Sequence, residues 1–252
     1  MDMAGKKRQQ DLKAKIGADH PFYVIIDDAY RVFNYDTPSI TGVCKSCCMY
    51  PEIEADFFNP PVRDLPLHYL QDWYFAAYDP GGIPKRVWGY LLPRVLEVLA
   101  VEHDVSTIGL EVSLNRFQTG QRENWNRAEW DVLDRFQTAY LARALSQTHD
   151  YLDDVLCMFA LAGWPLEDLV TQVMSCPDDV LAQRLWNDWC RGKPSIWVTA
   201  FWEGGQNSEV YAFYTSRALY NRMEALALAS DTPPDLANKA FSVAAVIGAS
   251  AT

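Results

Sequence analysis

Apolar residues recur three and four positions apart along most of the chain, and this spacing predicts amphipathic helices. The helix expected over residues 166–174 follows the pattern at every apolar position: Leu166, Leu169, Val170 and Val173. Residues 126–146 carry a longer apolar stripe. Asn126 and Glu129 have the spacing of a capping box, in which each side chain accepts a hydrogen bond from the other residue's backbone N–H. We therefore expect a well-defined helix to begin at Asn126.

The same periodicity predicts further helices, separated by short breaks rich in Pro, Gly and Asp. Their expected ranges are 22–33, 52–58, 64–78, 83–102, 105–117, 150–162, 177–190, 208–229 and 234–248. Pro93 lies inside the fourth range, where a proline predicts either a kink or two helices end to end. Asp150 is expected to cap the helix that follows it.

One segment has the composition of a strand. Residues 195–202 are rich in β-branched and aromatic side chains and lie between Pro194 and Gly204. A single strand has nothing to pair with, so an extended segment packed on helices is an equal alternative. The expected fold is thus all-α: a polar, basic segment over residues 1–18, followed by one compact multi-helix domain over residues 19–252.

Charge narrows the choice of partners. The net charge is −11. The first fifteen residues are basic, so the acidity falls on the remainder of the chain, which would repel nucleic acid. A basic protein partner would instead be attracted. The N-terminus lacks the apolar core of a secretory signal, and no apolar run approaches the length that spans a membrane. We therefore expect a cytoplasmic protein that binds neither nucleic acid nor membrane.

A cluster of three cysteines, Cys44, Cys47 and Cys48, is the most unusual local feature. It could hold zinc or act as a redox site, with His20, His68 or a distant cysteine as a fourth ligand. A closed zinc site requires four ligands, and the sequence offers no second motif to supply the fourth. The alternative is a set of small buried apolar side chains.

Two His-Asp dipeptides raise the possibility of a metal-dependent hydrolase. They are His103-Asp104 and His149-Asp150, and Asp179 could serve as a later ligand. Such dipeptides are short and frequent, and both fall at predicted helix boundaries. We therefore assign no catalytic residue, and this enzyme is the alternative to a binding function.

Nine Trp, thirteen Tyr and eleven Phe give the chain a heavy aromatic content. Exposed aromatic side chains are typical of interface hot spots, and we nominate Trp73, Trp125, Trp197 and Trp202 for a binding surface. An acidic body, many aromatics and no recognisable catalytic motif together favour a non-catalytic protein-binding protein. Its most specific form would be an immunity protein that neutralises a cognate bacterial toxin. A structural or adaptor role in a larger assembly is a third hypothesis.

Part of the chain resembles a group of uncharacterised bacterial proteins. The shared features are the close pair Cys47-Cys48, the acidic Pro51-Glu52-Ile53-Glu54, a short helix over 67–78 and Leu92-Pro93-Arg94. Two residues separate Cys44 from Cys47 here, against one in that group. The resemblance covers about a fifth of the chain and implies no activity.

Overall fold

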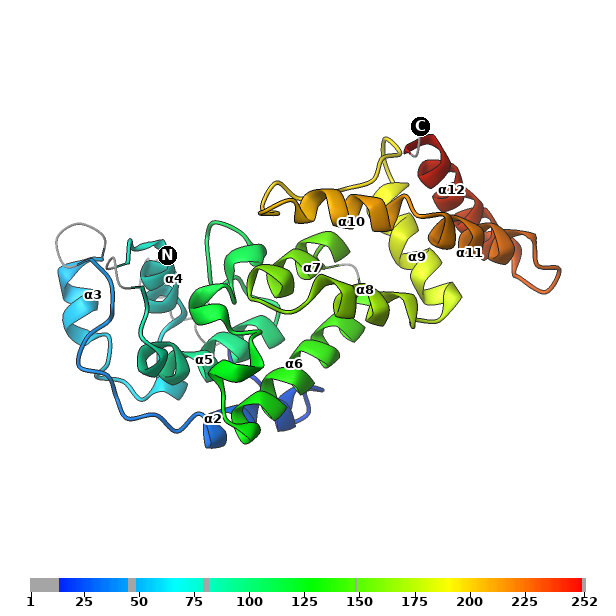
Figure 1. Cartoon of the computed structure of the whole chain (residues 1–252). Helices are drawn as coiled ribbons and strands as arrows, with labels where there is room; N and C mark the ends of the chain where they lie inside the picture. The colour runs from blue at the N-terminus through cyan, green and yellow to red at the C-terminus, as the bar shows by residue number, and fades with distance from the viewer. Residues whose placement is uncertain (1–13, 45–48, 79–81, 148, 251–252) are drawn as a thin grey trace, which may run out of the picture. The chain divides into compact units, whose positions relative to one another are not determined.

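The structure is a computed structural model, and it describes residues 14–44, 49–78, 82–147 and 149–250. Helices dominate the fold (Figure 1), which confirms the all-α prediction. The α-helices are α2 (Tyr23–Val32), α3 (Pro51–Asp56), α4 (Leu67–Phe75), α5 (Lys85–Ala100), α6 (Arg127–Ser146), α7 (Leu152–Leu161), α8 (Leu166–Met174), α9 (Asp178–Trp189), α10 (Gln206–Tyr214), α11 (Arg217–Leu228) and α12 (Pro234–Ser250). No helix within the described ranges has both the length and the apolar composition that crossing a membrane requires.

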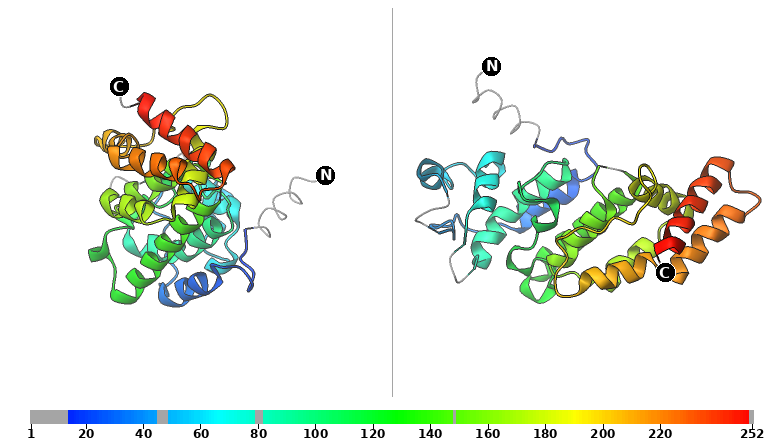
Figure 2. Two further views of the ribbon diagram at one scale, coloured as in Figure 1. Left: turned by 90° about the vertical axis from the view of Figure 1, so that its right-hand side faces the viewer. Right: turned by 90° about the horizontal axis from the view of Figure 1, so that it is seen from above.

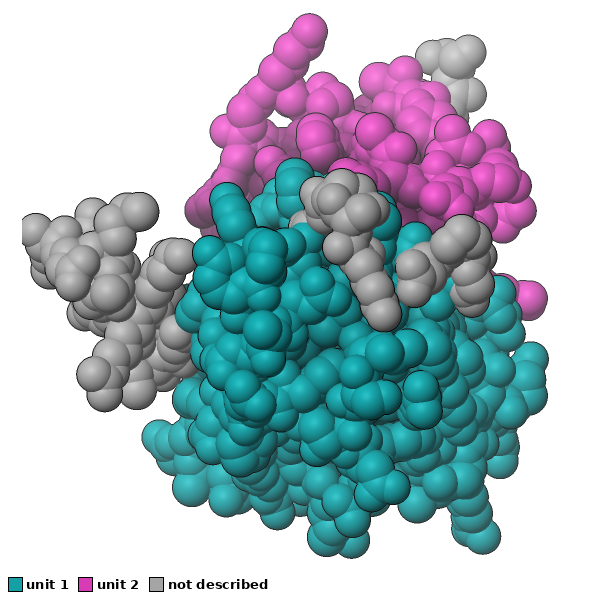
Figure 3. Space-filling model, turned by 90° about the vertical axis from the view of Figure 1, so that its left-hand side faces the viewer, with its two compact units in different colours: residues 1–140 teal, residues 141–252 magenta. Residues whose placement is uncertain are grey.

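Contacts divide the chain into two compact units, residues 1–140 and residues 141–252 (Figure 3). Each unit is described by itself below. The single domain that we expect over residues 19–252 stays a prediction.

Helix α5 forms the centre of the first unit. Every residue from Val87 to Ala100 is buried, because this stretch is apolar on almost all sides. Pro93 lies inside the helix, which continues through it, so the two-helix alternative is wrong. Gly89 permits the close approach of Tyr35, since a Cβ at this glycine would lie 2.7 Å from the tyrosine ring.

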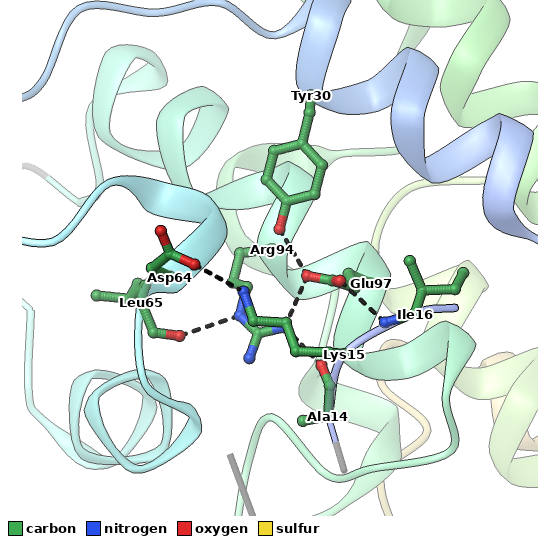
Figure 4. Close-up of polar contacts among 8 residues, drawn as sticks. All are labelled: Ala14, Lys15, Ile16, Tyr30, Asp64, Leu65, Arg94 and Glu97. Carbon is green, nitrogen blue, oxygen red and sulfur yellow. Dashed lines mark hydrogen bonds and ion pairs between the residues drawn. The ribbon is translucent and has the colours of Figure 1, made fainter. Parts of the chain in front are cut away.

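Two polar residues within α5 are also buried, and both belong to one cluster (Figure 4). Arg94 Nη1 lies 2.7 Å from Glu97 Oε2, which also accepts a hydrogen bond from Tyr30 Oη at 2.7 Å. Arg94 further donates to the backbone carbonyls of Ala14 and Leu65. The arginine of the Leu92-Pro93-Arg94 motif therefore links two separate segments to α5, and Glu97 links a third through Tyr30.

Residues 105–126 do not form the predicted helix. They contain three short 3-10 helices, namely η2 (Leu110–Val112), η3 (Arg116–Gln118) and η4 (Arg122–Asn124). Phe117 has a φ of 56°, in the left-handed region, which an α-helix does not tolerate. The hydroxyl of Thr119 holds this region together by accepting from Trp88 Nε1 at 2.8 Å and donating to the Leu114 carbonyl at 2.7 Å.

The predicted capping box at the start of α6 is confirmed. Asn126 N donates to Glu129 Oε2 at 2.9 Å, and Glu129 N donates to Asn126 Oδ1 at 3.0 Å. Glu129 also accepts a hydrogen bond from Tyr35 Oη at 2.6 Å. The helix start is therefore also tied to the segment that follows α2.

The second unit is built from short helices that pack on their neighbours. Helices α11 and α12 lie side by side in both views of Figure 2, and α12 also packs on α9. Arg222 of α11 donates to the Met174 carbonyl at 2.8 Å and to Asp178 Oδ1 at 2.6 Å, so it fixes the turn between α8 and α9.

The structure corrects one sequence prediction within this unit and decides between two alternatives at another place. The helix expected over 208–229 is two helices, because Ser216 begins α11 by accepting a hydrogen bond from Leu219 N at 3.2 Å. The strand-like residues 195–202 form an extended segment, and no sheet occurs in the described part of the chain. The alternative of an extended segment packed on helices is therefore correct.

Candidate functional site

Two exposed aromatic side chains stack on each other in the second unit. The rings of Tyr151 and Trp197 have centroids 5.0 Å apart and planes inclined by 26°. They are 43% and 44% exposed. Tyr151 immediately precedes α7, and Trp197 lies in the extended segment 195–202. Trp197 Nε1 also donates to Asp154 Oδ1 at 3.1 Å, which fixes the indole ring in one orientation.

The extended segment is held in place by Asp153, one residue earlier in α7. Asp153 Oδ2 accepts hydrogen bonds from Thr199 N at 2.7 Å and Trp202 Nε1 at 3.0 Å. Its other oxygen accepts from Tyr214 Oη at 3.0 Å. The carboxylate is only 2% exposed, and these three donors compensate its burial. Burial and the nearby Asp153 carboxylate raise the pKa of Tyr214 well above its ordinary value.

A polar cleft lies beside Tyr151 and has a volume of about 280 Å³. Its lining combines acidic, basic and amide side chains: His149, Asp150, Tyr151, Asn187, Asp188 and Arg191. Together with the Tyr151–Trp197 stack it forms the candidate binding site, which we name the aromatic cleft.

Arg184 stabilises the backbone and side chains that line the aromatic cleft through hydrogen bonds. It is 1% exposed, and its Nε donates to Asp188 Oδ2 at 3.0 Å. Its remaining N–H groups donate to the backbone carbonyls of Ala144, in the last turn of α6, and of Gln147 and Asp150, in the connection between α6 and α7. One buried guanidinium thus fixes the backbone that carries His149 and Tyr151.

The start of α7 is capped by a residue from another helix. Leu152 N donates to Asp188 Oδ2 at 3.0 Å, and the residue that directly precedes the helix is Tyr151. The helix therefore begins at Leu152, and the N-cap position predicted for Asp150 falls on Tyr151. Burial raises the pKa of Asp188, and its bonds with Arg184 and Leu152 N oppose that shift.

Of the four tryptophans nominated for a binding surface, Trp197 is exposed as expected. The surface position expected for Trp73, Trp125 and Trp202 is wrong, since these are 0%, 7% and 8% exposed. Each of the three indole N–H groups has a buried acceptor: the Thr41 carbonyl, the Thr119 carbonyl and Asp153 Oδ2, respectively. Because their polar ends are satisfied internally, these side chains belong to the two hydrophobic cores.

The His-Asp residues do not form a recognisable metal centre. His149 and Asp150 both line the aromatic cleft, while Asp179 lines a different hollow beside Leu145 and Gln183. In the first unit, the Asp104 carbonyl accepts a hydrogen bond from Gln71 Nε2. Within the described ranges no three His, Cys, Asp or Glu side chains are grouped so that they could hold a metal ion.

Most of the predicted thiol site lies outside the described residues, which include Cys44 but neither Cys47 nor Cys48. Cys44 N donates to the Ala77 carbonyl at 2.8 Å, beside the isolated bridge that joins Val43 to Tyr78. The Cys44/Cys47/Cys48 zinc site therefore stays a prediction.

The sequence analysis missed several members of the aromatic cleft, notably Tyr151, Asn187 and Arg191. Tyr151 directly follows His149-Asp150, so its place beside a candidate dipeptide could have indicated that it belongs to the site. Asn187 and Arg191 come from the end of α9 and the turn after it, and only the packing of α9 against α7 brings them to this place.

Comparison of the chain with protein-family models, with curated proteins and with solved structures gave no match.

Proposed function

We propose that this chain is a non-catalytic, cytoplasmic protein-binding protein that takes a basic protein partner through the aromatic cleft. The observation that carries the proposal is the stacked pair Tyr151 and Trp197, in which both rings are exposed and the Trp197 indole is oriented by a hydrogen bond to Asp154. Rigid aromatic side chains lose little conformational entropy on binding, and Trp and Tyr are enriched among interface hot spots.

Local charge favours a basic partner. Asp154 accepts the indole N–H of Trp197, and Asp150 and Asp188 line the adjoining cleft. Residues 141–252 contain thirteen Asp and Glu but only seven Lys and Arg. A Lys or Arg side chain of the partner could lie over the Trp197 ring, where a cation–π contact contributes about 0.5–2 kcal/mol. The same acidity would accelerate association with a positively charged surface.

The most specific form of the proposal is an immunity protein that neutralises a cognate bacterial toxin. It is tested by purifying the basic product of the gene beside this one and titrating it against the chain by isothermal titration calorimetry. We expect a complex at micromolar concentration or below, and an unrelated basic protein serves as the specificity control. No complex at that concentration would end the toxin hypothesis.

Variants then test the aromatic cleft itself. Trp197→Ala removes a side chain that is already exposed, so the fold should persist while affinity falls by about 30-fold, the effect of a hot-spot loss near 2 kcal/mol. Phe75→Ala is the matched control, because Phe75 is 71% exposed and belongs to the first unit. Equal affinities for the two variants would show that the partner docks elsewhere.

The alternative is a metal-dependent hydrolase that uses Cys44, Cys47 and Cys48 or the His-Asp pairs. The one observation in its favour is that His149 and Asp150 share a cleft with Asp188. Elemental analysis of protein purified without chelator separates the two functions. Near-stoichiometric zinc, iron or manganese that is lost in a Cys44→Ser variant would support the thiol site, and loss in His149→Ala would support the cleft.

A further inference from the structure

A second surface of the same unit has the opposite character to the aromatic cleft. A groove of about 390 Å³ runs between α9 and the C-terminal half of α12. Its lining is mostly apolar and contains no Asp or Glu: Trp186, Cys190, Pro194, Phe241, Ser242, Ala245, Val246, Ala249 and Ser250. We name it the α12 groove.

The α12 side of this groove is open to solvent. Phe241 is 66% exposed, and Ala245 and Ala249 follow it at intervals of four residues on the same exposed face. No charged residue occurs from Phe241 to the end of the chain. A charge-free exposed helix face with a large unburied aromatic is characteristic of a surface that another molecule covers.

Cations surround the groove. The Lys239 ammonium lies 5.3 Å and the Arg191 guanidinium 5.9 Å from the centroid of the Trp186 ring. Arg191 and Lys193 are exposed, flank the groove residues Cys190 and Pro194, and make no ion pair within the described ranges. Lys239 pairs with Asp235 of the same helix, so its charge is already compensated.

The shape and the charge of the groove select its occupant. Small-molecule sites enclose most of their ligand, whereas this groove is open along a helix. Small side chains at Ala245 and Ala249 would let a second helix approach closely, as in helix-in-groove recognition. Lys193, which is exposed and adjoins the groove residue Pro194, would pair with carboxylates beside the apolar stripe of that helix. We infer that the α12 groove binds an amphipathic helix of another protein, with an apolar stripe flanked by Asp or Glu.

The test is a selection from two libraries of helical peptides, each about 18 residues long, or roughly 27 Å of helix. Both libraries vary the apolar stripe among Leu, Ile, Phe and Met, and the flanking positions are Glu in one library and Lys in the other. We expect binders from the Glu library only. Their affinities for the full-length chain are measured by fluorescence anisotropy.

Variants locate the bound peptide. Ala245→Arg places a bulky charge on the exposed face of α12 and should weaken the selected peptides at least tenfold. Ala142→Arg, at an exposed position of α6 outside the groove, is the matched control. Lys193→Glu should weaken the Glu peptides and raise the affinity of their Lys counterparts. Circular dichroism establishes that the variants fold.

Four results would overturn the inference. The Glu library could yield no binder, or its binders could be unaffected by Ala245→Arg. Sedimentation could reveal a dimer of the chain that Phe241→Glu dissociates, which would assign the groove to a second copy. Dodecanoate could bind in the groove and displace every selected peptide, which would assign it to a small amphiphile. Because Trp197 is not in this groove, loss of peptide binding in Ala245→Arg but not in Trp197→Ala separates this inference from the proposed function.

Discussion

Arg184 and Asp188 form an ion pair, 3.0 Å from Nε to Oδ2, that acts beyond the helix in which both residues lie. The same oxygen of Asp188 accepts a hydrogen bond from the backbone N–H of Leu152. Arg184 donates to three backbone carbonyls, one in the last turn of α6 and two in the connection between α6 and α7. This one pair on α9 thus provides hydrogen-bond partners for backbone groups at both the end of α6 and the start of α7. The pair therefore fixes the backbone geometry around the aromatic cleft.

Removal of one partner should therefore destabilise the chain strongly. In Asp188→Ala the buried Arg184 guanidinium loses its ion-pair partner and Leu152 N loses its acceptor. We expect the free energy of unfolding to fall by about 3–5 kcal/mol. Asp188→Asn keeps an acceptor and should lose less. Urea denaturation followed by circular dichroism measures both variants, and Asp179→Ala in the exposed first turn of the same helix is the control.

The Arg184–Asp188 pair also allows a test of whether the partner binds through Trp197 alone. If Asp188→Asn folds and yet weakens binding of the partner while Trp197 is unchanged, the cleft contributes to recognition, through the charge of Asp188 or through the backbone that it holds. Equal binding by Asp188→Asn and the parent chain would confine recognition to the aromatic stack.

Local features of the fold were predictable from the sequence. The range of α8 and the capping box of α6 depend on residues within one or two turns of each other, so spacing alone determined them. The irregular region after α5 was not predictable, because Thr119 organises it through Trp88, which lies 31 positions away. Apolar content there suggested a helix that the left-handed φ of Phe117 forbids.

The candidate site was predictable only in part. Trp197 and His149-Asp150 were identified separately, and no spacing showed that they lie near one another. Three nominated tryptophans were buried for a reason that the sequence does not display: each N–H reaches an acceptor that only the folded chain supplies. The acceptor of Trp202 is Asp153, 49 positions earlier in the chain. Exposure of an aromatic residue follows from such long-range partners more than from its neighbours in sequence.

Asp153 should control the mobility of the segment that carries Trp197. The amide of Thr199 is buried and donates to Asp153 at 2.7 Å, so we expect it to exchange slowly with solvent. In Asp153→Ala this amide should lose much of its protection, because the carboxylate that accepts its hydrogen bond is removed. Hydrogen exchange followed by mass spectrometry of the peptide containing residues 195–202 measures the change. Asp168→Ala, in the first turn of α8, is expected to leave this peptide unaffected.

The capping box offers a prediction in the first unit. Asn126→Ala removes the acceptor for the backbone N–H groups of Ala128 and Glu129. Loss of a cap of this kind costs about 1 kcal/mol. Asn126→Asp and Asn126→Ser preserve a capping oxygen, so each should keep most of the stabilisation that the cap provides. Chemical denaturation of the three variants decides the point, and equal losses in all three would assign the effect to another role of Asn126.

Stability should fall in alkali. Burial raises the pKa of Tyr30, Tyr74 and Tyr214 in the folded chain. Their unfolded pKa is about 10. A raised folded pKa means that the native state holds the proton more tightly, so the stabilisation is complete below pH 10 and is lost as the pH rises above it. The urea midpoint should therefore decline above about pH 10, and Tyr214→Phe should make that decline shallower. Tyr50→Phe, at a side chain that is 67% exposed, provides the comparison.

The buried pair at the centre of the first unit gives the last prediction. Arg94 is 0% and Glu97 5% exposed, and Glu97 also accepts hydrogen bonds from Tyr30 and from Ile16 N. Arg94→Met leaves a buried carboxylate without its cation and should cost about 3–5 kcal/mol. Glu97→Gln leaves a buried cation without its carboxylate and should also be costly. Each single change leaves the other partner as an uncompensated buried charge, and the double variant leaves none. The double variant should therefore lose less free energy of unfolding than the two single variants combined. A double-mutant cycle by urea denaturation measures this coupling, and strictly additive losses would mean that Arg94 acts through the carbonyls of Ala14 and Leu65 instead of through Glu97.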